Sequence, residues 1–170
     1  MADTGPPPAQ TLPDLIRWRA EKHGQRIALK FLSDDGASVQ WTYQELWSRC
    51  VSVAGKLAQL ASAQPENQQP GRVLLLFPPG LDFMAGFIGV QIAGLIPVPT
   101  CYPKPGREMP RLDSAARDCR PLAIVIDEET LVGLDEDKLC DEAASAAKVT
   151  TTRPTDAPDA IDLPKVDPDS

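Results

Sequence analysis

The spacing of apolar residues changes several times along the chain, and each spacing predicts a different element. Over residues 12–20, apolar side chains recur at every third or fourth position, as on one face of a helix. Apolar and polar residues alternate over 27–32 and again over 39–41, with an Asp-Asp-Gly turn between them, which predicts a β-hairpin. Helical spacing returns over residues 46–60. The first part of the chain is therefore expected to form a helix, a hairpin and a longer helix.

Capping signals mark the ends of these two helices. Thr11 is a good cap for the first helix, and the Lys-His-Gly ending around His23 is a stop signal. We therefore expect His23, the one histidine, to stabilise a helix end rather than to take part in catalysis. Thr42 and Glu45 form a Thr-x-x-Glu capping box before the second helix, in which Cys50 belongs to the apolar stripe.

Beyond residue 72 the apolar runs become continuous. Residues 73–77 form the kind of uninterrupted run that is buried on both faces in a parallel sheet. Helices and strands then alternate, which predicts an α/β fold with a doubly wound, mostly parallel sheet and flanking helices. The expected later helices begin at Leu81 and cover 112–119 and 136–148, and the expected later strands cover 95–98, 122–126 and 149–152.

Composition divides the chain into three parts. Residues 1–10 are small, polar and rich in proline, and we expect them to be disordered. Residues 153–170 hold four prolines and five aspartates, so we expect an acidic tail or linker there. Residues 11–152 remain as the folded unit, which suits one domain.

Charge and cysteine usage narrow the class of protein. The formal net charge of −7, without a basic stripe, argues against binding nucleic acid through its phosphates. The apolar tract over 81–99 is interrupted by Asp82, Gln91 and Pro97, so we expect no membrane span. The cysteines have neither a CxxC pair nor zinc-ligand spacing, and we expect reduced thiols in a soluble cytoplasmic protein. They are Cys50, Cys101, Cys119 and Cys140.

The loops that follow the first two parallel strands are the candidate site, because ligands gather at the carboxyl ends of such strands. The first loop is Pro78-Pro79-Gly80, whose prolines lack the N–H donors of a phosphate cradle. It is expected to be a rigid corner, with direct ligand contact as the alternative. The second loop, 100–106, continues to Arg107 and offers Tyr102, Lys104 and Arg107. These two cations could steer a phosphate or a carboxylate, or could be solvated loop charges.

Other candidates have simple structural explanations. In the helix after Leu81, alternating glycines and phenylalanines suit close packing on the sheet, and an acyl-chain pocket is the alternative. Asp135-Glu-Asp137 suits a helix start, and no second cluster completes a metal or acid/base site. The sequence also lacks G-x-G-x-x-G and G-x-x-x-x-G-K-[ST], which disfavours a free-standing nucleotide-binding module. We therefore assign no catalytic, cofactor-binding or metal-binding residue.

Several segments together resemble the adenylate-forming (AMP-dependent synthetase/ligase) superfamily. They are Leu75-Leu-Phe-Pro-Pro-Gly-Leu-Asp-Phe-Met-Ala-Gly-Phe-Ile-Gly89, Ala93-Gly-Leu-Ile-Pro-Val-Pro99, Trp41-Thr-Tyr-Gln-Glu-Leu46 and Arg111-Leu-Asp-Ser-Ala-Ala-Arg-Asp-Cys-Arg-Pro121. Within the superfamily, the proline-rich corner looks most like the fatty acyl-AMP ligases. The resemblance covers about residues 11–152 and implies a partial amino-terminal domain.

The resemblance implies an activity that needs more than this chain. Enzymes of that family activate a fatty acid with ATP and Mg²⁺, release pyrophosphate, and pass the acyl group to the phosphopantetheine thiol of an acyl carrier protein in polyketide or nonribosomal peptide assembly. Their phosphate loop, metal-binding acid and catalytic lysine lie downstream of the part matched here. We therefore expect the chain to be an inactive fragment that needs the rest of a ligase or megasynthase. A fragment of an acyl-CoA synthetase and a noncatalytic interaction module are the alternatives.

Overall fold

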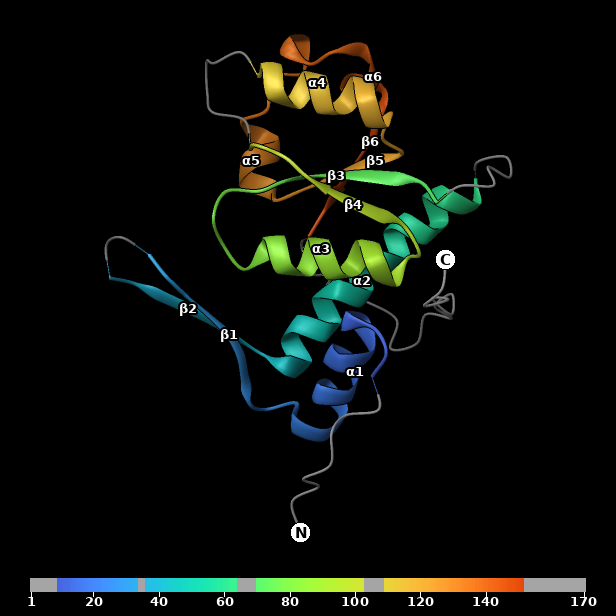
Figure 1. Ribbon diagram of the computed structural model, residues 1–170. Helices are drawn as coiled ribbons and strands as arrows, with labels where there is room; N and C mark the ends of the chain where they lie inside the picture. The colour runs from blue at the N-terminus through green and yellow to red at the C-terminus, as the bar shows by residue number, and fades with distance from the viewer. Residues whose placement is uncertain (1–8, 34–35, 64–69, 103–108, 152–170) are drawn as a thin grey trace.

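The first four elements form a helix, a hairpin and a long helix, as the spacing predicts. A computed structural model describes residues 9–33, 36–63, 70–102 and 109–151 (Figure 1). Its first elements are α1 (Leu12–His23), β1 (Ile27–Leu32), β2 (Ser38–Thr42) and α2 (Tyr43–Ser62). Strands β1 and β2 pair antiparallel and project from the body of the molecule (Figure 1). Residues 1–8 of the predicted disordered start, and the whole of the predicted acidic tail, lie outside the described residues.

The predicted caps are present in the structure. The Thr11 hydroxyl accepts a hydrogen bond from the Asp14 N–H at 3.2 Å, and α1 ends at His23. At the start of α2, the Thr42 hydroxyl accepts from the Glu45 N–H at 3.2 Å, and the Glu45 carboxylate accepts from the Thr42 N–H at 2.8 Å. The capping box is therefore confirmed, and it fixes where the chain leaves the hairpin and enters the helix.

The second part of the chain is a four-stranded parallel sheet. Its order is β4-β3-β5-β6, so the chain starts in an inner strand, moves to one edge, and then crosses to the other side of β3. Figure 1 shows α3 on one face of this sheet, and α4 and α6 on the other. The doubly wound arrangement is thus confirmed. The elements are β3 (Arg72–Leu76), α3 (Asp82–Ile92), β4 (Ile96–Pro99), α4 (Pro110–Cys119), β5 (Ala123–Ile126), α5 (Glu128–Val132), the 3₁₀ helix η1 (Glu136–Lys138), α6 (Asp141–Ser145) and β6 (Ala147–Thr150).

The inner strands bury both of their faces, as their continuous apolar sequence predicts. Leu74 and Leu76 of β3 point to the side covered by α4 and α6. Val73 and Leu75 point to the side covered by α2 and α3. All four side chains are at most 1% exposed. The sheet is therefore the central layer between two groups of helices.

Helix α2 packs across α3 because α3 has small residues at the crossing. A Cβ atom added at Gly89 would lie 2.8 Å from the Val53 Cβ and 2.9 Å from the Cys50 carbonyl oxygen. Cys50 itself is fully buried, which confirms that it belongs to the apolar stripe of α2. The glycine therefore sets how closely the two helices approach each other.

The predicted helix over 136–148 is wrong. The segment divides into η1, α6 and β6, and the last strand begins at Ala147 rather than at 149. Leu139 and Cys140 between the short helices have extended backbone and are only 9% exposed. The Cys140 N–H donates to the Asp113 Oδ1 of α4 at 3.2 Å. Because this contact anchors the backbone to α4, tertiary packing overrides the local preference for a helix.

The short helix α5 is an element that the apolar pattern did not predict. It begins immediately after β5, where the Asp127 Oδ1 accepts a hydrogen bond from the Thr130 N–H at 2.8 Å. An aspartate followed by two glutamates is a suitable start for a helix, since carboxylates favour its amino end.

Among the described residues, no helix is long and apolar enough to cross a membrane.

Candidate functional site at the strand ends

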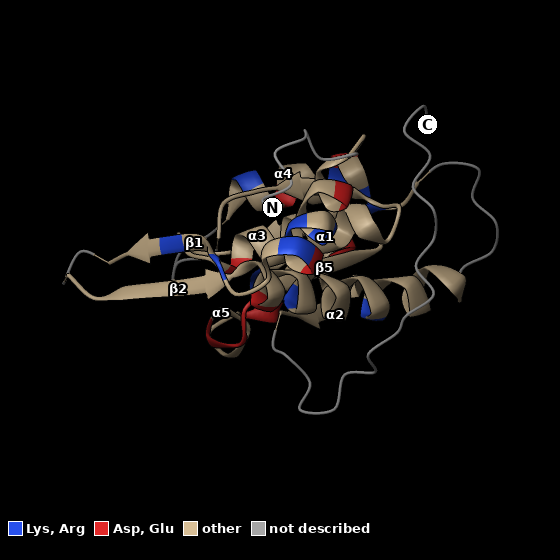
Figure 2. Cartoon of the chain, turned by 90° about the horizontal axis from the view of Figure 1, so that it is seen from below, with Lys and Arg blue, Asp and Glu red and all other residues tan. Residues whose placement is uncertain are grey.

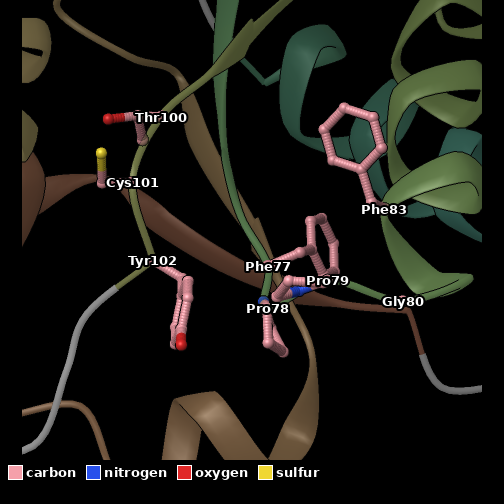
Figure 3. Close-up of a pocket in the computed structure, with 8 residues that line it drawn as sticks. All are labelled: Phe77, Pro78, Pro79, Gly80, Phe83, Thr100, Cys101 and Tyr102. Carbon is pink, nitrogen blue, oxygen red and sulfur yellow. The ribbon is translucent and has the colours of Figure 1, made fainter. Parts of the chain in front are cut away.

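The carboxyl ends of β3 and β4 meet at one edge of the sheet, as predicted. Leu75 pairs with Pro99 in the parallel ladder, and the Thr100 N–H continues that pairing by donating to the Leu75 carbonyl oxygen at 3.2 Å. The two strands therefore end at the same level. A pocket of about 300 Å³ lies between the loops that follow them (Figure 3). It is lined by Phe77, Pro78, Pro79, Gly80, Phe83, Thr100, Cys101 and Tyr102.

The proline corner forms part of the wall of this pocket. Pro78 and Pro79 follow β3 after one intervening residue, Phe77, and α3 begins two residues after Gly80. The sequence left a rigid corner and direct ligand contact as alternatives. The structure is compatible with both, because the corner turns the chain and also faces the pocket. Tyr102 of the second loop also lines it, whereas Lys104 and Arg107 lie outside the described residues.

Aromatic rings form the inner wall. Phe77 and Phe83 meet edge to face with their ring centroids 6.4 Å apart, and Phe83 stacks on Phe87 at 5.8 Å. The ring of Phe77 lies against α3 because Gly86 has no side chain there: an added Cβ would be 2.8 Å from the Phe77 Cε2. Phe83 of α3 therefore shapes the pocket directly, and Gly86 does so by making room for Phe77. The sequence predicted an apolar helix here, but it did not predict that Phe83 and Tyr102 line the same pocket.

A hydrogen bond between two side chains links the residue after β6 to the first residue of α3. The Thr151 hydroxyl donates to the Asp82 Oδ1 at 3.0 Å, and the Thr151 N–H donates to the Ile126 carbonyl oxygen at 3.3 Å. Thr151 is only 2% exposed. Sequence analysis missed this pair, although both residues lie next to a strand or helix end. The two hydrogen bonds of Thr151 therefore connect the end of β6 to the start of α3 and to the end of β5.

Lys56 of α2 reaches the same end of β6. Its Nζ donates to the Thr150 carbonyl oxygen at 2.9 Å. Burial lowers the pKa of Lys56 below its usual value, and the nearby carboxylate of Glu128 opposes this shift. The ammonium group thus connects α2 to the far edge of the sheet rather than facing the pocket lining.

The four cysteines differ in accessibility. All are free thiols. Cys50, Cys119 and Cys140 are buried, and burial raises the pKa of each thiol. Cys101 is exposed and lines the pocket. A thiol reagent at neutral pH should therefore react first with Cys101.

Two ion pairs near η1 have carboxylates that are exposed to solvent. Asp135 pairs with Lys138 at 3.1 Å, and Glu136 pairs with Lys148 at 3.5 Å, with both carboxylates about half exposed or more. Figure 2 shows acidic residues around α5 and basic residues on α1 and α2. Within the described parts of the chain, no group of three or more histidine, cysteine or acidic residues could hold a metal ion.

The described residues do not fit ATP and Mg²⁺ by themselves. The corner after β3 has two prolines, which offer no N–H to a phosphate group. The described lining of the pocket contains neither a cation nor a carboxylate. The phosphate groups of a nucleotide bound here would therefore meet no cationic side chain from the described lining.

The comparisons with known proteins agree on one family. A model of the AMP-binding enzymes matches residues 16–169. The chain is 36% identical over 129 residues to the 4-hydroxyphenylalkanoate adenylyltransferase of Mycobacterium tuberculosis, covering 71% of this chain and 20% of that protein. It is 31% identical over 125 residues to the medium-chain-fatty-acid–[acyl-carrier-protein] ligase JamA of Moorena producens, with the same two shares.

A solved structure supports the same relationship. The fatty acid AMP ligase from Legionella pneumophila superposes with a TM-score of 0.67 at 26% identity, covering 85% of this chain and 24% of that one. The chain spans about a fifth of the length of the curated relatives it matches. It belongs to the family of AMP-binding, adenylate-forming enzymes and matches the amino-terminal part of its fatty acyl-AMP ligases.

Proposed function

We propose that this chain is the amino-terminal part of a fatty acyl-AMP ligase. The complete enzyme activates a fatty acid with ATP and Mg²⁺ to an acyl-adenylate, and then transfers the acyl group to an acyl carrier protein. The observation that carries this proposal is the family match over residues 16–169, together with relatives named as acid-activating ligases, of whose length the match covers 20%. The partners are the rest of the ligase or megasynthase and the carrier protein, and the location is the cytoplasm.

The site indicates which parts of such an enzyme this chain supplies and which parts the rest of the polypeptide supplies. This chain supplies the parallel sheet, the proline corner and the apolar pocket at the strand ends. The described residues supply no cradle for phosphate groups, so the chemistry at the phosphates depends on residues of the remaining polypeptide. We therefore propose that the chain is a scaffold and pocket wall rather than the catalytic part.

The first test is an assay of the chain alone. The purified 170-residue protein is incubated with a fatty acid, ATP and Mg²⁺, and any acyl-adenylate is trapped with hydroxylamine and measured as hydroxamate. We expect no hydroxamate above the level without protein, while JamA in the same assay provides the positive control. Hydroxamate that depends on this protein would contradict the proposed division of work.

The second test concerns the longer product. Sequencing of the transcript across the Ser170 codon should show a reading frame that continues into a Ser/Thr/Gly-rich phosphate loop. The longer protein should then exchange pyrophosphate into ATP in a fatty-acid-dependent manner and acylate a carrier protein. Acylation of coenzyme A instead would indicate an acyl-CoA synthetase. A stop directly after Ser170 would favour a noncatalytic interaction module.

A second class of substrate is favoured by one observation. The relative at 36% identity is named for 4-hydroxyphenylalkanoates, which carry an aromatic ring as well as an alkyl chain. An aryl-bearing acid is therefore the alternative to a simple fatty acid. Competition between the two acids in the exchange assay of the longer protein separates these candidates.

A further inference from the structure

The hairpin of β1 and β2 exposes large apolar side chains. Ile27, Leu32 and Val39 are 56%, 66% and 52% exposed, and they make up half of the exposed large apolar residues in the described parts of the chain. Only the base of the hairpin is covered, where Trp41 packs among side chains of α2 and α3. The rest extends beyond the helices in both views (Figures 1 and 2). Contact with a partner would remove this apolar surface from water.

The backbone of the hairpin is also open along both outer edges. The Ser33 N–H donates to the Ala37 carbonyl oxygen at 2.9 Å, and hydrogen-bonded pairs alternate along an antiparallel ladder. The register therefore makes Phe31 and Val39 a hydrogen-bonded pair. The residues between such pairs point their N–H and C=O groups outward, and no other described strand pairs with them. These outward residues are Lys30 and Leu32 on β1, and Ser38 and Gln40 on β2.

The parallel sheet, by contrast, is closed along the outer edge of β4. The Thr100 N–H donates to the Leu75 carbonyl oxygen at 3.2 Å, so every second residue before Thr100 also points its backbone groups toward β3. The residues of β4 that point outward are Pro97 and Pro99, which have no N–H. Proline at both outward positions leaves no donor for a further strand.

A lysine closes the outer edge of β6. The Thr151 N–H donates to the Ile126 carbonyl oxygen of β5 at 3.3 Å, so the Thr150 carbonyl group points away from β5. The Nζ of Lys56 donates to that carbonyl oxygen at 2.9 Å. A further strand would have to displace this ammonium group, and lysine is a residue with which proteins protect sheet edges. Among the described strands, those of the hairpin therefore have the open edges.

We propose that the hairpin accepts an extended strand from the remaining polypeptide of the ligase. The proposal rests on the proposed function, since it needs that polypeptide. The relatives are long enough to supply such a strand, because the match covers 20% of their length. The added strand pairs its backbone with the outward groups of one edge, and its side chains pack beside Leu32 on β1 or beside Val39 on β2. Because a two-stranded hairpin is marginally stable by itself, a third strand stabilises it.

Hydrogen–deuterium exchange of the backbone amides in the longer protein tests the added strand. Mass spectrometry with electron-transfer fragmentation resolves single amides, and the Phe31 amide, which faces β2, is the internal reference. We expect both outward amides of one edge, Lys30 with Leu32 or Ser38 with Gln40, to have protection factors within about tenfold of that of Phe31. Fast exchange of all four outward amides beside a slow Phe31 would overturn the proposal.

The same measurement identifies the occupant of the protected edge. In the isolated 170-residue chain, the outward amides should be at least about tenfold less protected than in the longer protein. Equal protection in the isolated monomer would mean that another segment of this chain covers the edge. Protection that disappears on dilution, together with a dimer in sedimentation equilibrium, would assign the edge to a second copy. Either of these two results would contradict the proposal.

Proline variants of the longer protein test the pairing at each edge. Leu32→Pro and Gln40→Pro each remove one outward N–H, which the ladder between β1 and β2 does not use. The variant on the protected edge should speed the exchange of the other outward amide of that edge about fivefold, because one ladder hydrogen bond is lost. The variant on the opposite edge is the matched control and should leave that exchange unchanged. A slow Phe31 amide shows that the hairpin itself is intact. Unchanged exchange with proline on the protected edge would contradict the added strand.

This outcome is separable from that of the proposed function. Amide exchange in the hairpin measures strand pairing and needs neither ATP nor a fatty acid. The proposed function fails instead if the longer protein does not exchange pyrophosphate into ATP with any carboxylic acid. Fast outward amides in a longer protein that is active in the pyrophosphate assay would remove the added strand and leave the ligase assignment in place.

Discussion

Replacing Gly89 by alanine tests the close crossing of α2 and α3. The added methyl group would lie 2.8 Å from the Val53 Cβ and 2.9 Å from the Cys50 carbonyl oxygen. Because one of these atoms belongs to the backbone of α2, the clash cannot be relieved by turning a flexible side chain. The two helices must move apart, and Val53 and Leu57 of α2 then lose part of their packing against the sheet.

The size of the effect follows from two opposing contributions. Overpacking of a well-packed core costs about 1–3 kcal/mol, and the close approach to a backbone oxygen puts the cost at Gly89 in the upper part of that range, at about 2–3 kcal/mol. Alanine is favoured over glycine in a helix by about 1 kcal/mol, which offsets part of that cost. The expected net loss for Gly89→Ala is about 1–2 kcal/mol, which corresponds to a decrease in Tm of about 2–8 °C for a chain of this size.

Thermal unfolding followed by circular dichroism measures this change. Gly80→Ala is the matched control, because a Cβ at Gly80 would have only one neighbour within 4 Å, the Pro78 carbonyl oxygen at 3.9 Å. It should change Tm by much less than Gly89→Ala. A Gly89→Ala protein that is as stable as the unchanged chain would show that the crossing is looser than the structure indicates.

Three further changes test individual contacts. Thr42→Ala removes the capping box of α2 and should lower the free energy of unfolding by about 1 kcal/mol in urea titrations, whereas Thr42→Ser should retain most of it. Thr151→Val removes the hydrogen bond to Asp82 and should cost about 0.5–1.5 kcal/mol; no change in Thr151→Val would mean that this contact does not hold the strand ends. Burial raises the pKa of Cys50, so the unfolded chain ionises this thiol first. Stability should therefore fall as pH rises above 9.0, and it should fall less steeply in Cys50→Ala; parallel curves would contradict this assignment.

The sequence predicted elements whose signals are local. The capping box at Thr42 depends on residues three positions apart, and the hairpin depends on alternation around one turn. The continuous apolar run over 73–77 required a strand with both faces covered, which the sheet provides. The position of the candidate site also followed, because strand order alone places the loops after β3 and β4 at one edge.

Contacts between segments that are far apart in the sequence could not be predicted from such local signals. The expected helix over 136–148 is divided because Leu139 and Cys140 pack against α4 and Asp113 holds the intervening backbone. No feature of residues 136–148 indicates that the Cys140 N–H would bind Asp113, which lies 27 positions earlier in the chain. The helix was therefore a reasonable local preference that a tertiary contact overrode.

By itself, the amino-acid sequence determined the order of the elements, the parallel sheet, the proline corner and the family resemblance, since each depends on residue types at short, regular spacing. Only the tertiary structure decided which rings form the pocket, which thiol faces it, and how closely α2 approaches α3. Phe83 and Tyr102 come from different segments, and their joint role exists only once β3 and β4 pair and α3 folds back on the sheet. The physical reason is that a pocket is formed by side chains that meet in space, whereas periodicity records only which face of one element each side chain occupies.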